Sequence, residues 1–112
     1  MRETLEQFLA CLYQERFFEA HEVLESLWFP RRFELCDEIK LLKGFINAAV
    51  SFELLKKERP KAAQKVWQNY LKYKPLISSI NSEYKEDFYK LSWHVEKIHA
   101  MKNSLVSHEA RL

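Results

Sequence analysis

The chain has 112 residues, which is enough for one domain and too short for two. Its 18 basic and 16 acidic residues nearly balance, so charge gives no reason to expect a nucleic acid or an anionic membrane as partner. One Gly and three Pro are too few for the turns of a sheet protein. The composition predicts a single all-α domain over residues 1–112, a compact helical bundle of about five helices.

The N-terminal residues lack the apolar stretch of a signal peptide, and no segment is apolar for long enough to span a bilayer. We therefore expect a cytoplasmic protein without a membrane partner. Cys11 and Cys36 are the only cysteines, and both lie among apolar residues at helical spacing. Two reduced thiols are expected, with a structural disulfide as the alternative.

Two helices are predicted in the N-terminal third. Thr4 and Gln7 have the spacing of a capping box, which predicts a helix from Thr4 to about Gln14. A second helix is expected from about Phe17 to just before Pro30, because proline disfavours helix in the residue ahead of it.

A central helix is predicted from between Phe33 and Asp37 to about Lys57. It carries two apolar stripes, which is typical of a helix packed on both sides. The stripes are Leu35, Ile39, Leu42, Ile46 and Ala49, and Leu41, Phe45, Ala48, Phe52 and Leu55. Gly44 lies mid-helix at a cost of about 1 kcal/mol relative to Ala, so we expect another helix to approach closely there.

The C-terminal half predicts two further helices. One extends from Pro60 to just before Pro75 and has an apolar stripe of Ala63, Val66, Trp67, Tyr70 and Leu71. The last covers about residues 82–106, with Asn81-Ser82 as its N-cap. Its seam is Tyr84, Phe88, Leu91, Val95 and Ile98. That seam should pack on the bundle or on a second copy, forming a homodimer through the C-terminal helix.

A group of polar residues interrupts the apolar arc of the second helix. His21 and Glu25 are four residues apart, so they share one face, and we expect that face to point into the bundle. Glu22 lies at the edge of the arc. A buried His–Glu pair has two explanations, a hydrogen bond that only fixes packing, or a functional site.

The segment His21 to Glu25 has the form His-Glu-x-x-Glu, which is similar to the His-Glu-x-x-His motif of zinc enzymes. On this hypothesis His21 and Glu25 would be metal ligands and Glu22 the base. A third ligand is not evident, with His94 and His99 as candidates in principle. The Arg-x4-His spacing of Arg16 and His21, seen in some small helical ribonucleases, is a weaker signal.

Three further residues complete the candidate pocket. Trp28 ends the second helix, and Lys43 and Asn47 lie on a polar arc of the central helix near Gly44. If that arc faces the second helix, Lys43 and Asn47 would meet the carboxylates of Glu22 and Glu25.

The run from Phe17 to Trp28 resembles the Phe-Phe-Glu-Ala-His-Glu-x-Leu-Glu-x-x-Trp signature of the domain of unknown function 309 family. A second similar block follows at residues 43–49 and a third, weaker one at residues 60–63, so the family-like core covers about residues 13–73. This chain has Glu15 where the family usually has a Gly in a turn, and Leu54 where a His is common. Lys43 and Asn47 stand where the family usually has two Gln. The resemblance implies an all-helical bundle without an established activity.

The sequence thus favours a binding or interaction module with a polar pocket around the His-Glu-x-x-Glu segment. The pocket comprises His21, Glu22, Glu25, Trp28, Lys43 and Asn47, and its partner would be a small ligand or a protein. The alternative is a metal-assisted hydrolase with a divalent metal as cofactor.

Overall fold

The computed structural model describes the backbone of residues 1–111 and the side chains of residues 1–103. The helices are α1 (Arg2–Tyr13), α2 (Phe17–Trp28), α3 (Asp37–Lys56), α4 (Pro60–Tyr73), α5 (Leu76–Ser79) and α6 (Lys85–Arg111). A 3₁₀ turn, Phe29–Arg31, follows α2. The described residues contain no strand, and five long helices confirm the predicted all-α bundle. The four-residue α5 was not predicted from the sequence.

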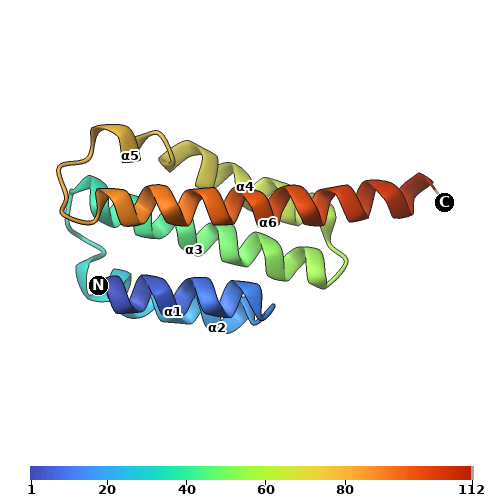
Figure 1. Cartoon of the computed structure of the whole chain (residues 1–112), viewed down its shortest axis with the longest axis horizontal. Coiled ribbons are helices and arrows are strands. Elements are labelled where there is room, and N and C mark those ends of the chain that lie inside the picture. The colour runs from blue at the N-terminus through green and yellow to red at the C-terminus, as the bar shows by residue number, and fades with distance from the viewer. Residues whose placement is uncertain (112) are drawn as a thin grey trace.

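The α3 helix lies at the centre of the bundle (Figure 1). It packs against α2 on one side and α4 on the other, while α1 packs on α2 and α6. This arrangement explains the two apolar stripes of α3, which are buried apart from their ends. Leu35 was wrongly placed in a stripe. It precedes the helix, which begins at Asp37, and its side chain is 96% exposed.

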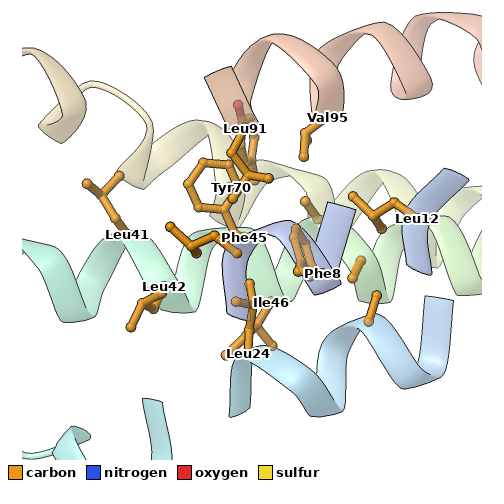
Figure 2. Close-up of a cluster of buried hydrophobic side chains, with 14 of the residues drawn as sticks. Phe8, Leu12, Leu24, Leu41, Leu42, Phe45, Ile46, Tyr70, Leu91 and Val95 are labelled. Atoms are coloured by element: carbon orange, nitrogen blue, oxygen red, sulfur yellow. The ribbon is translucent and has the colours of Figure 1, made fainter. Parts of the chain in front are cut away.

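One continuous hydrophobic core joins the five long helices. Figure 2 shows side chains from α1, α2, α3, α4 and α6 converging on it. Its labelled members include Phe8, Leu24, Phe45, Tyr70 and Val95. Leu71, which we had placed on the apolar stripe of α4, is instead 39% exposed.

At Gly44, α4 packs closely against α3. A Cβ atom built on Gly44 would lie 3.1 Å from Cβ of Tyr73 and 3.8 Å from Cα of Tyr70. The predicted close approach of another helix is therefore confirmed, and α4 is that helix.

Two predicted helix starts were wrong. The amide of Leu5 already bonds to the carbonyl of Met1, so α1 begins at Arg2 and Thr4 caps nothing. Helix α6 begins at Lys85, three residues after Ser82. The Ser82 hydroxyl accepts the amide hydrogen of Tyr84 and donates to Glu38, so it supports the preceding turn and does not cap the helix.

The predicted seam of α6 packs on the chain's own bundle. Phe88, Leu91, Val95 and Ile98 are all buried within one copy of the chain. A helix of 27 residues is about 40 Å long. This length accounts for most of the 46 Å long axis, and the C-terminal turns of α6 extend beyond the other helices (Figure 1).

In the part of the chain that the structure describes, no helix is both long enough and apolar enough to cross a membrane. Cys11 is buried, Cys36 is partly exposed, and both are free thiols, as predicted.

Candidate functional site

The orientation of α2 decides where the predicted site residues lie. Phe17, Ala20 and Leu24 form its buried face. His21 and Glu25 therefore lie on the flank of that face, and their side chains are 19% and 44% exposed. The expectation that both point into the bundle was wrong, because Leu24 lies at the middle of the buried face and His21 and Glu25 lie to one side of it.

His21 makes its polar contacts within α2. Its Nδ1 donates a hydrogen bond of 3.0 Å to the carbonyl of Phe18, and its Nε2 lies 3.4 Å from Oε1 of Glu25. The predicted His–Glu contact therefore exists, at the surface of the bundle. Glu22 is exposed to solvent.

Lys43 contacts α2 in a way that the sequence did not predict. Its ammonium group lies 4.4 Å from the centre of the Trp28 ring, where a cation–π attraction holds it. Among the described residues no ion pair joins Lys43 to Glu22 or Glu25, so the proposed meeting of charges is not found.

Asn47 connects α3 to α4. Its side-chain amide donates to the carbonyl of Lys43 at 2.7 Å, and its Oδ1 accepts a hydrogen bond of 3.2 Å from Asn69. Asn47 thus stands on the same stripe of α3 as Lys43, one turn further along.

Two sets of contacts mark where α2 packs against α3. Trp28 meets Lys43 at one end, and His21 lies beside Val50 and Leu54 at the other. Four of the six predicted pocket residues therefore lie where α2 meets α3, along a line that we call the α2–α3 seam. The seam comprises His21, Glu25, Trp28 and Lys43. Glu22, which is exposed, and Asn47, which contacts α4, lie outside it.

A small cavity of about 220 Å³ opens beside His21. Its walls include Phe18, Val50 and Leu54, with the Glu53–Lys57 pair at the rim, where Nζ lies 3.6 Å from Oε1. Sequence reasoning missed these residues. Their spacing could have revealed them, because Val50 and Leu54 lie three and seven residues after Asn47 on the same stripe.

The residues considered as metal ligands do not lie close to one another. His94 contacts Tyr13, and His99 stacks on Trp67. Among the described residues, no group of three His, Cys, Asp or Glu side chains could hold a metal ion. The Arg16 guanidinium pairs with Glu19.

The fold and the geometry together define a small all-helical domain with a partly exposed seam between α2 and α3, in which polar side chains and Trp28 lie beside a small apolar cavity. The family model named "Domain of unknown function (DUF309)" matches residues 5–66, more than half of the chain, and the chain belongs to this family. The matched range contains the whole seam and ends within α4, so α5 and α6 lie beyond it. No curated protein and no solved structure matches the chain.

Proposed function

We propose that this chain is a binding module that holds a segment of a protein partner along the α2–α3 seam. The observation that supports the proposal most directly is the cavity of about 220 Å³ beside His21. Small-molecule sites typically occupy about 300–1,000 Å³, so this cavity suits a single inserted side chain better than a free ligand.

The surroundings of the cavity fit a protein segment. Phe18, at its edge, is 58% exposed, which offers an apolar contact to an incoming chain. Glu53 and Lys57 supply charges of both signs at the cavity, and the ring of His21 adds a polar group. An apolar centre with a polar rim is the usual anatomy of a protein interface.

The alternative, a metal-assisted hydrolase, has less support. His21 and Glu25 contact each other, and no third ligand stands beside them in the described part of the chain. Catalytic zinc sites need three protein ligands and an open position.

Isobutanol and p-cresol, neutral analogues of the Leu and Tyr side chains, test the proposed site by NMR titration. We expect saturable shift changes in the methyl groups of Val50 and Leu54 and in the ring of His21. A Leu54→Glu variant should lose these changes, because a carboxylate would enter the apolar cavity.

Leu35→Glu is the matched control, because Leu35 is fully accessible and lies outside the cavity. It should bind both probes as the unmodified chain does. Probe-induced shifts that avoid His21, Val50 and Leu54 in the unmodified protein would show that the seam is not the binding site.

A further inference from the structure

A second cavity, of about 430 Å³, lies between α3, α4 and α6. It shares no lining residue with the α2–α3 seam or with the cavity beside His21. Its volume falls in the range of small-molecule sites. Much of its wall comes from Trp67, Leu71, His99 and Asn103, which lie beyond the residues that the family model matches.

An aromatic stack forms one wall of this cavity. The rings of Trp67 and His99 are parallel to within 4°, with centroids 3.8 Å apart. Trp67 also stacks on Tyr70, whose hydroxyl donates to Glu96 of α6. The stack joins α4 to α6, so this wall is held in place before any ligand arrives.

The rest of the lining divides into apolar and polar parts. Leu55 and Leu71 continue the apolar wall, while Gln64 and Asn103 place amide groups in it. Burial lowers the pKa of His99, against a smaller opposing effect of Glu96, so its ring is neutral at pH 7 and can donate or accept a hydrogen bond. A ligand would therefore meet an apolar surface and several uncharged hydrogen-bonding groups.

Charge decides which ligand fits. Lys61, in the first turn of α4, carries the one full charge among the described lining residues, and the lining contains no carboxylate. A cationic ligand would find no counter-charge, whereas a monoanion would find one. Sites of this kind are apolar with a few convergent polar groups that fix orientation.

We propose that the cavity between α4 and α6 binds a small carboxylate with an aromatic or branched apolar body. The apolar body lies against Trp67 and Leu71, and the carboxylate faces Lys61. This site is separate from the seam and does not depend on the function proposed there.

Three probes of similar shape test the proposal on the full chain: phenylacetate, phenylacetamide and phenethylamine. Amide resonances in ¹H–¹⁵N spectra and the Trp fluorescence report binding. We expect saturable binding of phenylacetate with shifts at Gln64, His99 and Asn103. Phenylacetate should bind about threefold tighter than phenylacetamide, because one exposed ammonium group adds a modest attraction. Phenethylamine should bind most weakly.

Lys61→Gln should remove the preference for phenylacetate over phenylacetamide. Lys65→Gln is the matched control, since Lys65 is on the same helix, is exposed and does not line the cavity. Both substitutions change exposed side chains. The comparison of the three probes on the unmodified chain requires neither substitution. Equal affinity for the acid and the amide, or no saturable binding of phenylacetate, would each overturn the proposal. Shifts centred on Tyr89 and Trp93, two exposed aromatic side chains of α6 outside the cavity, would overturn it as well.

Discussion

His21 supports the fold through contacts to its own helix. It bonds to the carbonyl of Phe18 and touches the Glu25 carboxylate, while its side chain remains 19% exposed. A pair four residues apart on a helix surface contributes about 0.2–0.5 kcal/mol. The polar pair is therefore a minor source of stability, which leaves its residues free to contact a partner.

The first prediction concerns the coupling of this pair. His21→Ala should lower the free energy of unfolding by about 1 kcal/mol through its lost hydrogen bond and packing. Glu25→Ala should lower it by less than about 0.5 kcal/mol, because the carboxylate is half exposed. The double variant should fall short of the sum by about 0.3–0.5 kcal/mol.

Urea midpoints of the four proteins measure this coupling, with the exposed Glu22→Gln as a control that should stay within error of the unmodified chain. A coupling above about 2 kcal/mol would mean that the pair is buried in solution, contrary to the geometry described here.

The second prediction concerns Gly44. Replacing Gly by Ala in a helix normally stabilises it by about 1 kcal/mol. At Gly44 the new methyl group would lie 3.1 Å from Cβ of Tyr73, so the last turn of α4 would have to shift by a few tenths of an ångström. Overpacking of this kind costs about 1–3 kcal/mol, and we expect Gly44→Ala to destabilise the chain by about 1 kcal/mol.

Thermal and urea unfolding of the Gly44→Ala protein would measure the change. Gly44→Val should be worse, because its larger side chain cannot avoid Tyr73. A stabilised Gly44→Ala protein would contradict the close α3–α4 contact.

At the scale of the elements, α1 is joined to α6 by an ion pair between their first turns. The Arg2 guanidinium donates to both carboxylate oxygens of Asp87, at 3.1 and 3.0 Å. These hydrogen bonds lower the pKa of Asp87 below its usual value. The pair therefore links the attachment of α6 to pH.

The third prediction follows from that shift. A carboxyl group with a lowered folded-state pKa adds stability at pH values above its unfolded pKa of about 3.9. That stability is lost as the pH falls through the folded-state value. Asp87→Asn should thus be slightly less stable than the unmodified chain at pH 7, and the difference should shrink toward zero below about pH 4.

Urea midpoints at pH 7 and pH 3 would check this, with Arg2→Gln expected to behave in the same way as Asp87→Asn. A stability difference that is the same at both pH values would show that the ion pair is not its cause.

The fourth prediction is that the bundle requires α6. Phe88, Leu91, Val95 and Ile98 are buried in the core, and each such side chain contributes about 1.5–3 kcal/mol on burial. Their sum, about 6–12 kcal/mol, is comparable with the whole stability of a small domain. Deleting Ser82 to Leu112 should therefore abolish cooperative unfolding.

Circular dichroism with thermal unfolding would measure this loss. A chain that ends at Asn103 is the control, because it retains all four buried side chains and should unfold cooperatively. A Ser82–Leu112 deletion that unfolds as cooperatively as the full chain would refute the role of α6.

At the scale of the whole molecule, the burial of the apolar face of α6 in the chain's own core changes the prediction of a homodimer. Since this apolar face already packs against other helices of the same chain, a dimer through α6 would have to form on the outer face of the helix. There Tyr89 is 47% exposed and Trp93 is 60% exposed. These two aromatic side chains lie four residues apart on one side of the helix.

The fifth prediction is that the chain self-associates through this outer face. Its sedimentation coefficient should rise with protein concentration, and Trp93→Glu should remain monomeric. Phe29→Glu, an equally exposed aromatic position in the 3₁₀ turn, should associate as the unmodified chain does. A single species at all concentrations would refute the dimer.

The sequence by itself determined the five long helices and their order along the chain. Pro30, Pro60 and Pro75 separate them, and the apolar period of 3.6 residues identifies the helix that is buried on both sides. It also predicted the close approach at Gly44. Glu15, at the family's turn Gly, has a φ of 58°, the left-handed conformation that glycine suits, so the family pattern located the α1–α2 turn.

Only the tertiary structure decided how far each helix is rotated about its axis. A sequence shows that His21 and Glu25 share a face, but packing against α3 centres the buried face of α2 on Leu24 and leaves Glu25 half exposed. Packing likewise pairs Lys43 with Trp28 and brings His99 onto Trp67 from a distant helix. Periodicity is a local property of one segment, whereas seams and cavities depend on several segments at once, and for that reason they appeared only in three dimensions.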